Sequence, residues 1–317
     1  MLDKALVVIG PTASGKSALA LDIAKQIRCE IISLDSALIY KDMDIGTAKP
    51  TPEELSSVPH HLVSIIDPKD SYSAARFAED CTRLVGEITR RGALPVICGG
   101  TMMYYKALVE GLSPLPSTVP EVRERILAEG QLHGWPYMHE KLRDIDPQSY
   151  ARLSPNDKQR VSRALEVFAM TGRPLSSYFA EKGDKCPFAR KVAVLLPEED
   201  RIELRKVIRL RFEQMMAAGL IDEVKKLKER GDLSLALPSM RCVGYRQVWE
   251  YLDGLHTYEE TVELSVIATA RLAKHQMTWM RKLVSDESEK DRLVLKPYAE
   301  ENLTKLREFI DSPWLNG

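Results

Sequence analysis

Short apolar runs alternate with amphipathic segments up to about residue 111. The runs that predict strands are Ala5–Ile9, Glu30–Leu34, Leu62–Ile66 and Leu94–Cys98. Between the last two, Ser73 can cap a helix that continues to about Arg91 and is closed by Gly92. Strands that alternate with helices in this way are typical of a parallel α/β sheet.

The pattern changes after this region. The stretch Leu112–Pro120 contains three prolines, which predicts a linker. From there to about Pro187 the pattern is helical without a clear strand. Asp157 is placed to begin one of these helices and Gly172 to end it.

The α/β pattern then returns. Val192–Leu196 predicts a strand that rejoins the sheet, and 200–218 and 258–283 predict long helices. We therefore expect an α/β core formed by residues 1–112 and 188–317, interrupted by an all-helical domain at 113–187.

The first strand is followed directly by the sequence GPTASGKS, which matches G-x-x-x-x-G-K-[ST]. The glycines let the backbone curl so that its N–H groups can converge on one anion. Lys16 adds a positive charge, and the Ser17 hydroxyl can hold Mg²⁺. The core is therefore predicted to resemble that of P-loop NTPases. The loop should bind a diphosphate or triphosphate through Gly10, Pro11, Thr12, Ala13, Ser14, Gly15, Lys16 and Ser17.

One part of a nucleotide-hydrolysing site is missing. P-loop NTPases normally have an apolar strand that ends in an aspartate near the metal ion. Here the best candidate, Leu94–Cys98, ends in Gly99-Gly100-Thr101 instead. A small-molecule kinase stays open as an alternative, but it lacks this acid.

Asp35 ends the predicted strand Glu30–Leu34 and should lie at the carboxyl edge of the sheet, one strand away from the phosphate loop. A carboxylate there could act as a general base. Equally, it could only cap the turn before Ser36. Thr101 ends another strand, where its hydroxyl could touch a phosphate or simply cap a turn.

Arg211 lies within an apolar helical stripe formed by Leu204, Ile208, Phe212 and Met215. An arginine is seldom placed on a buried face without a partner. It could form a buried ion pair, or its guanidinium could clamp a phosphate. The phosphate loop favours the second interpretation.

Basic residues gather in three places although the formal net charge is only −1. The helix 258–283 has a basic face with Trp279 at its border. Further clusters lie at Lys158–Arg163 and Arg241–Arg246. Such faces are often merely solvated, but cations beside an exposed aromatic also suit RNA. Three clusters on a nearly neutral chain indicate a polyanion larger than a nucleotide.

The remaining sequence features bear on location. No run of about 18 apolar residues predicts a membrane span, and no signal-peptide pattern precedes the first strand. Five cysteines without C-x-x-C spacing fit reduced thiols and no zinc site. We expect a cytoplasmic monomer that does not bind membranes.

Several motifs together resemble the tRNA dimethylallyltransferase family, in the order expected for that family. They are GPTASGKS, DSALIY at Asp35–Tyr40, GTAKP at Gly46–Pro50, GGT at Gly99–Thr101, QRVSRALEV at Gln159–Val167, RFEQMMAAGLIDEV at Arg211–Val224, RCVGYRQVWEYL at Arg241–Leu252 and AKHQMTWMR at Ala273–Arg281. The resemblance covers most of the chain and is closest to bacterial members. It departs at His275, where the family usually has arginine.

This resemblance implies transfer of a dimethylallyl group from its diphosphate to N6 of the adenine directly 3′ of a tRNA anticodon, with Mg²⁺ as cofactor. No ATP would be hydrolysed, which would explain the missing acid. Asp35 would accept the N6 proton, while Thr101 and Arg211 would contact the diphosphate. The helical insertion would hold the anticodon arm.

The resemblance also implies a set of tRNA contacts. They are Asp35, Ser36, Ala37, Leu38, Thr101, Arg123, Gln159, Arg160, Val161, Ser162, Arg163, Arg241, Cys242, Val243, Gly244, Tyr245, Arg246, Lys274, His275, Gln276, Met277, Thr278, Trp279, Met280 and Arg281. Besides the kinase, a prenyltransferase for free adenine nucleotides and a non-catalytic RNA-binding protein stay as alternatives. The basic clusters and the motif order favour the tRNA enzyme.

Overall fold

The structure is a computed structural model that describes residues 3–180, except 112, 114 and 117, and residues 186–197, 201–286 and 291–310. The chain forms two compact units, Met1–Leu108 with Cys186–Gly317, and Val109–Lys185. Part of the linker predicted at Leu112–Pro120 lies outside the described residues.

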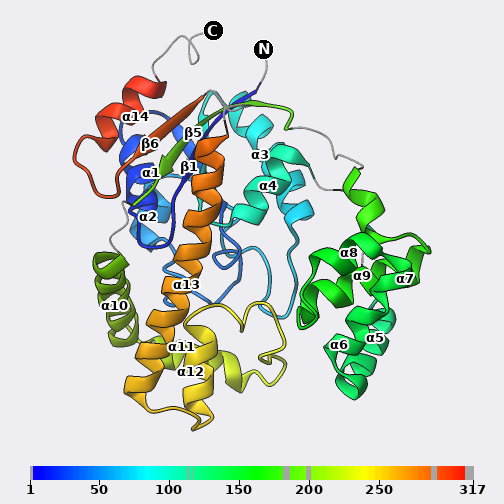
Figure 1. Ribbon diagram of the computed structural model, residues 1–317. Coiled ribbons are helices and arrows are strands. Elements are labelled where there is room, and N and C mark those ends of the chain that lie inside the picture. The colour runs from blue at the N-terminus through cyan, green and yellow to red at the C-terminus, as the bar shows by residue number, and fades with distance from the viewer. Residues whose placement is uncertain are drawn as a thin grey trace. The chain divides into compact units, whose positions relative to one another are not determined.

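A parallel sheet forms the centre of the larger unit (Figure 1). Its described strands run in the order β3-β2-β4-β1-β5-β6, and each pair of neighbours is parallel. Their bounds are β1 Lys4–Ile9, β2 Cys29–Leu34, β3 His60–His61, β4 Leu94–Gly99, β5 Ala189–Leu195 and β6 Arg292–Leu295. All strands therefore end at one edge, where the loops that follow them meet.

Two features of the sheet differ from the sequence prediction. The expected strand Leu62–Ile66 is wrong, because Leu62 and Ser64 have φ values of 61° and 54° and cannot extend the backbone. This segment instead bonds back to residues 38 and 39, with N–H to O distances of 3.0 Å from Ser64 and 2.8 Å from Ile65. In addition, β6 was not predicted.

Helices cover both faces of the sheet. Helices α1 (Lys16–Ala24) and α14 (Asn302–Ile310) share a hydrophobic cluster with Leu6 and Val8 of β1. Since alternate strand residues point to opposite faces, Val7 faces the other side, where α3 (Ala74–Arg90) packs. The Ser73 hydroxyl accepts a hydrogen bond from the Arg76 N–H, which confirms the predicted helix start.

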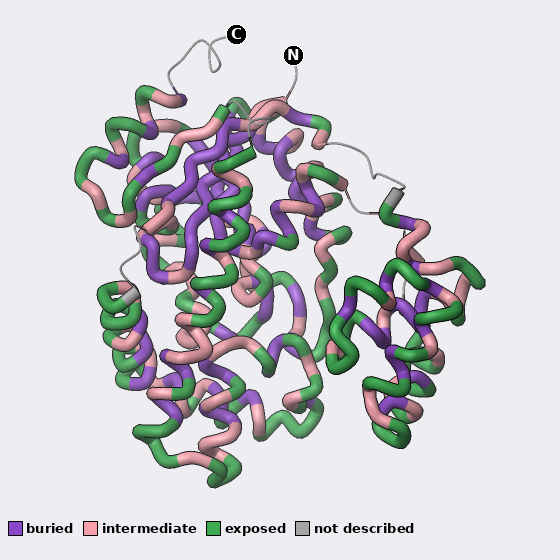
Figure 2. The backbone as a smooth tube through the Cα atoms, viewed as in Figure 1, coloured by how far each residue is buried: buried purple, intermediate pink, exposed green. Residues whose placement is uncertain are grey.

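A helical lobe belongs to the same unit and contributes to the site. It contains α10 (Arg201–Ala217), α11 (Leu220–Glu229), α12 (Tyr245–Leu252) and α13 (Tyr258–Ser285), and the short helices α2 (Pro52–Ser57) and α4 (Met102–Glu110) complete the unit. The lobe packs around a second hydrophobic cluster that includes Ile39 and Tyr40, which follow β2. In Figure 2 the buried residues gather in the sheet and between these helices.

The smaller unit is helical and has its own core. It contains α5 Pro120–His133, α6 Trp135–Glu140, α7 Leu142–Ile145, α8 Pro147–Arg152, α9 Lys158–Thr171 and the 3₁₀ helix η1 Leu175–Ala180. Asp157 caps α9, and Gly172 ends it with a φ of 67°, as the sequence predicted. Among the described residues, no helix in either unit has the length and hydropathy needed to cross a bilayer.

Candidate active site

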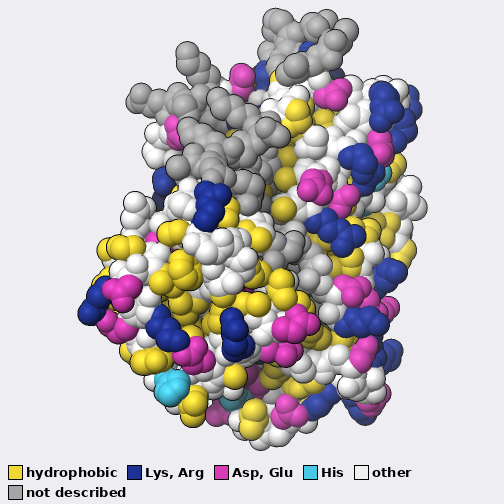
Figure 3. All heavy atoms as spheres, turned by 90° about the vertical axis from the view of Figure 1, so that its right-hand side faces the viewer, with side chains coloured by type: hydrophobic (Ala, Val, Ile, Leu, Met, Phe, Trp, Pro, Cys, Tyr) yellow, Lys and Arg dark blue, Asp and Glu magenta, His cyan; other side chains and the backbone are white. Residues whose placement is uncertain are grey.

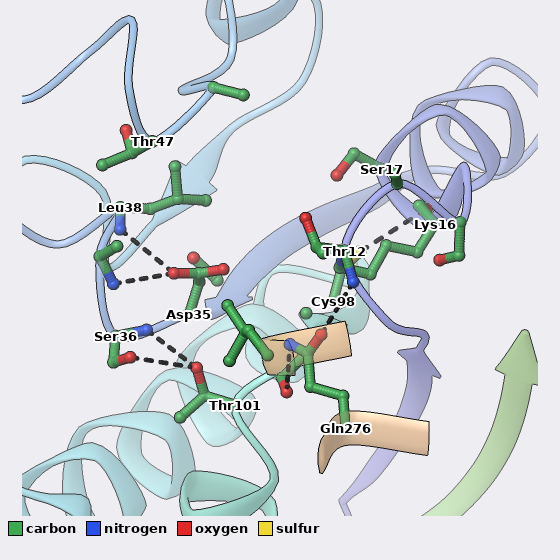
Figure 4. A pocket seen from close by; sticks show the side chains of 18 of the residues that line it. Thr12, Lys16, Ser17, Asp35, Ser36, Leu38, Thr47, Cys98, Thr101 and Gln276 are labelled. Carbon is green, nitrogen blue, oxygen red and sulfur yellow. Dashed lines mark hydrogen bonds between the residues drawn. The ribbon is translucent and has the colours of Figure 1, made fainter. Parts of the chain in front are cut away.

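The loops at the carboxyl edge of the sheet surround a cavity of about 740 Å³. Its wall is formed by the phosphate loop after β1, Asp35–Leu38 after β2, Gly99–Met103 after β4, and side chains from α10 and α13. In Figure 4, Lys16 and Ser17 lie on one side of the cavity, while Asp35, Ser36 and Thr101 lie on the other. All of these residues belong to the larger unit.

The backbone of the phosphate loop is prepared for an anion. Gly15 has a φ of 79°, and a Cβ at Gly10 would come within 2.4 Å of the Ser14 hydroxyl, so both positions need glycine. Within the described chain, the N–H groups of Ala13, Ser14 and Gly15 have no hydrogen-bond partner. Helix α1 starts directly behind them without a side-chain cap. Unpaired N–H groups at a helix N-terminus favour binding of a phosphate.

Two cations from different elements face the cavity. The Lys16 Nζ donates to the Pro11 carbonyl oxygen at 3.2 Å. Burial lowers the pKa of Lys16, while Cys98 and Asp35 oppose this effect. Burial also lowers the pKa of Arg211, which has no ion pair or hydrogen bond among the described residues. This excludes a buried ion pair within that part of the chain and leaves Arg211 available to an anion.

Asp35 uses one carboxylate oxygen to cap the turn and leaves the other without a partner in the described residues, so the cap is confirmed and the base role stays a prediction. Its Oδ1 accepts hydrogen bonds from Ala37 N–H at 2.8 Å and Leu38 N–H at 3.4 Å, as a turn cap does. Its Oδ2 has no partner in the described structure. One expectation needs correction, since β4 lies between β1 and β2 and Asp35 is therefore two strands from the phosphate loop.

Thr101 follows the intervening strand β4 and is linked to the Asp35 turn. Its Oγ1 accepts a hydrogen bond from Ser36 N–H at 3.0 Å and lies 3.3 Å from the Ser36 hydroxyl. The N–H groups of Gly100 and Thr101 bond to the Leu34 carbonyl oxygen at the end of β2. The β4 loop is thereby fixed beside Asp35.

Gln276 of α13 connects this loop to the phosphate loop. Its Oε1 accepts a hydrogen bond from Thr12 N–H at 2.9 Å, and its Nε2 donates to the Gly100 carbonyl oxygen at 3.0 Å (Figure 4). A Cβ at Gly100 would lie 2.6 Å from this Nε2, so the close approach requires glycine. The sequence placed Gln276 among the tRNA contacts, whereas in the structure its amide is used within the protein.

Glu223 of α11 is a positioning residue that the sequence did not single out. Its carboxylate accepts hydrogen bonds from the N–H groups of Asp44, Ile45 and Gly46, at 2.9, 2.8 and 3.3 Å, and from the hydroxyl of Tyr245. This fixes the GTAKP segment, whose first residues line the cavity. Both motifs are visible in the sequence, but their contact spans 177 residues or more and leaves no local signal.

Most of the residues predicted to contact tRNA fall into three groups. Arg241, Cys242, Val243, His275 and Trp279 line the cavity together with Ser36, Ala37 and Leu38. Lys274, Thr278 and Arg281 line a second hollow between α10 and α13, of about 750 Å³. Arg123, Gln159 and Arg160 are exposed on the smaller unit, where the Arg163 guanidinium donates to the Thr118 hydroxyl and the Pro116 carbonyl oxygen. Two further predicted contacts lie on α12 of the larger unit: Arg246 forms an ion pair with Glu250 at 2.9 Å, and Gly244 is the N-cap of the helix.

Four of the predicted contacts need correction because their side chains are buried. Val161 and Ser162 face the core of the smaller unit, and Tyr245 and Met280 pack inside the larger one. They lie on the inner faces of helices whose outer faces carry the cations. A contiguous sequence motif includes both faces of a helix, and only the outer face can meet RNA.

The metal prediction rests on Ser17. In the described residues there is no group of three or more His, Cys, Asp or Glu side chains that could hold a metal ion. Ser17 is exposed and lines the cavity. Mg²⁺ typically uses one or two protein oxygens together with phosphate oxygens and water, and the hydroxyl fits such a site.

Comparisons with known proteins show the family to which this chain belongs. A family described as IPP transferase matches residues 38–283, and one described as isopentenyl transferase matches residues 3–68. This chain belongs to the IPP transferase family. A tRNA dimethylallyltransferase from Burkholderia multivorans is 54% identical over 277 residues, 86% of this chain and 85% of the relative. One from Paraburkholderia xenovorans is 53% identical over 279 residues, 87% and 89% of the two chains.

Solved structures extend the similarity of this IPP transferase family member to three dimensions. A tRNA isopentenylpyrophosphate transferase from Bacillus halodurans matches with a TM-score of 0.70 and 34% identity, covering 99% of this chain and 97% of the other. A eukaryotic dimethylallyltransferase acting on tRNA matches with a TM-score of 0.80 over 99% and 80% of the chains. At 24% identity, the latter shows a common fold.

Proposed function

We propose that this protein transfers a dimethylallyl group from dimethylallyl diphosphate to N6 of the adenosine directly 3′ of the anticodon of tRNAs. The proposal rests mainly on one observation, that a phosphate loop and a carboxylate with a free oxygen line the same cavity. The curated relatives named tRNA dimethylallyltransferase support it.

The phosphate loop is suited to the leaving group. As the bond from the allylic carbon to oxygen breaks, negative charge develops on the diphosphate. Lys16, Arg211 and the unpaired N–H groups of the loop stabilise that charge. Mg²⁺, held by the Ser17 hydroxyl and diphosphate oxygens, would further neutralise it.

Asp35 is suited to remove a proton from the acceptor base. The exocyclic nitrogen of adenine is a weak nucleophile, so its proton must leave as the new C–N bond forms. The free Oδ2 of Asp35 accepts this proton, while Oδ1 stays bonded to the turn. Overall, one C–O bond breaks, one C–N bond forms, the proton moves to Asp35, and diphosphate departs.

The size and lining of the cavity support the two substrates. A volume of about 740 Å³ lies within the range of small-molecule sites. Met103, Leu272 and Trp279 supply apolar surface for the prenyl chain. The target base must leave its stack to enter, as in other enzymes that modify bases.

Charge alone does not locate the RNA surface. On the face shown in Figure 3, Lys and Arg side chains lie among Asp and Glu side chains, with hydrophobic and uncharged atoms between them. The support for RNA comes instead from particular exposed cations, including Arg241 at the cavity and Arg160 on the smaller unit. A cytoplasmic location and a monomeric state stay predictions.

The test supplies purified protein with Mg²⁺, labelled dimethylallyl diphosphate and one of three acceptors. These are an anticodon stem-loop with adenosine next to the anticodon, the same stem-loop with guanosine there, and AMP. We expect label only in the first. Label in AMP would support an enzyme of free nucleotides, and label in none of them would refute prenyl transfer.

A further inference from the structure

A tyrosine near the C-terminus lies against the phosphate loop. Tyr298 follows β6, whose parallel pairing with β5 brings the chain to the same edge of the sheet as the loop. The residue lies outside the two segments matched by the family descriptions, 3–68 and 38–283. None of the motifs in the sequence includes it.

Tyr298 makes two separate contacts with the loop. Its hydroxyl donates to the Ala13 carbonyl oxygen at 2.6 Å. Its ring covers Gly15, because a Cβ there would lie 3.0 and 3.1 Å from two ring carbons. A side chain at Gly15 would therefore collide with the ring as well as strain the backbone.

The turn that carries Tyr298 is anchored on both sides. Before it, Leu295 pairs with Leu195 at the end of β5. After it, the Asn302 amide donates to the Lys296 carbonyl oxygen at 2.6 Å. Tyr298 itself has a φ of 58°, an unfavourable conformation for a residue with a large side chain. The anchored turn thus keeps Tyr298 in a conformation that the chain would otherwise leave.

The hydroxyl contact controls the direction of a backbone donor. In a trans peptide the N–H points opposite to the preceding C=O. By holding the Ala13 carbonyl, Tyr298 fixes the orientation of the Ser14 N–H, which has no partner in the described chain. Arg211 and Tyr298 line the same cavity as this N–H.

Building on the proposed function, we propose that Tyr298 is a positioning residue for the donor diphosphate. It holds the Ala13–Ser14 peptide so that the Ser14 N–H faces the bound anion, and its ring keeps Gly15 in place. The C-terminal segment thereby completes a binding site whose sequence motif lies near the N-terminus.

The test compares Tyr298→Phe, which removes only the hydroxyl, with Tyr298→Ala, which also removes the ring. Tyr258→Phe, at an exposed tyrosine that does not line the cavity, serves as the matched control. Affinity for inorganic diphosphate is measured by calorimetry with Mg²⁺ present, alongside the affinity for the stem-loop and the thermal unfolding midpoint. Diphosphate binding requires no turnover, so this test remains valid even if prenyl transfer is absent.

We expect Tyr298→Phe to weaken diphosphate binding by about 3- to 10-fold, the usual effect of one hydrogen bond, and Tyr298→Ala to weaken it further. Stem-loop affinity should stay unchanged. Unchanged diphosphate affinity in Tyr298→Phe would overturn the proposal. So would an equal loss of stem-loop affinity and a lower unfolding midpoint in Tyr298→Phe, because these indicate general destabilisation.

Discussion

Replacing Gln276 by leucine should impair donor binding, because this amide joins the phosphate loop to the loop after β4. The substitution removes the hydrogen bonds to Thr12 N–H and to the Gly100 carbonyl oxygen, at 2.9 and 3.0 Å. Leucine has a similar size and preserves the helix propensity of α13. The change therefore tests the two hydrogen bonds more than the packing.

The magnitude follows from those two bonds. Each neutral hydrogen bond contributes about 0.5–1.5 kcal/mol net. Gln276 is half-buried beside the cavity, so water can partly replace its amide. A total of about 1–3 kcal/mol corresponds to a 5- to 150-fold loss of diphosphate affinity. The turnover number should also fall, since Gly100 precedes Thr101 and the Asp35 turn.

Gln276→Glu provides a sharper variant of the same test. An ionised carboxylate can still accept from Thr12 N–H, but it repels the Gly100 carbonyl oxygen and the bound anion. Lowering the pH protonates the carboxyl group, which can then donate to Gly100. The deficit relative to the wild-type protein should therefore shrink as the pH falls.

The assay is a calorimetric titration of inorganic diphosphate with Mg²⁺, combined with donor kcat and KM and the thermal unfolding midpoint. Gln214→Leu, at an exposed position of α10, is the matched control. Wild-type diphosphate affinity and turnover in Gln276→Leu would refute the reasoning. A loss confined to stem-loop affinity would instead assign Gln276 to RNA binding.

Three further predictions concern other parts of the larger unit. Asp35→Asn should lower kcat by roughly 10²-fold or more while diphosphate still binds, as expected for a general base. Glu30→Gln should lower the urea unfolding midpoint at pH 7 and lower it less at pH 3, because bonding to Arg91 lowers the pKa of Glu30 to about 2. The stability that Glu30 contributes is fully present above about pH 4.5, the ordinary pKa of a glutamate. It is lost as the pH falls through the lowered pKa of about 2. Lys274→Ala and Arg281→Ala should each weaken stem-loop binding and reduce its salt dependence, as measured by filter binding from low to high salt.

Each of these predictions can fail in a recognisable way. Near-normal turnover in Asp35→Asn would show that Asp35 is not the general base. If the unfolding midpoints of Glu30→Gln and the wild-type protein differ equally at pH 7 and pH 3, protonation of Glu30 does not contribute to acid unfolding. If the salt dependence of stem-loop binding is unchanged in both Lys274→Ala and Arg281→Ala, this side of α13 does not contact RNA. Arg83→Ala, which removes a cation already paired with Asp80 and Glu87, is the control for a simple change of net charge.

The sequence by itself determined the features that depend on neighbouring residues. The spacing of GPTASGKS predicts a phosphate loop because turn, cation and hydroxyl lie within eight residues. The helix boundaries at Ser73, Asp157 and Gly172 follow from local capping. The core strands β1, β2, β4 and β5 follow from short apolar runs bounded by turn residues.

Apolar character did not distinguish a strand from a packed loop at Leu62–Ile66. The run is hydrophobic because residues such as Ile66 pack into the core of the helical lobe. Its backbone turns through positive φ values at Leu62 and Ser64, which composition does not reveal. Sequence pattern likewise did not separate buried from exposed positions at Val161 and Met280, which belong to motifs predicted to contact RNA but face the interior.

Only the tertiary structure decided which distant segments meet at the carboxyl edge of the sheet. The strand order places Thr101 between Asp35 and the phosphate loop. Gln276, Glu223 and Tyr298 then fix the loops around the cavity through hydrogen bonds that span between 176 and 285 residues. Such contacts leave no periodicity or local propensity in the sequence, because they depend on how packed elements are arranged in space.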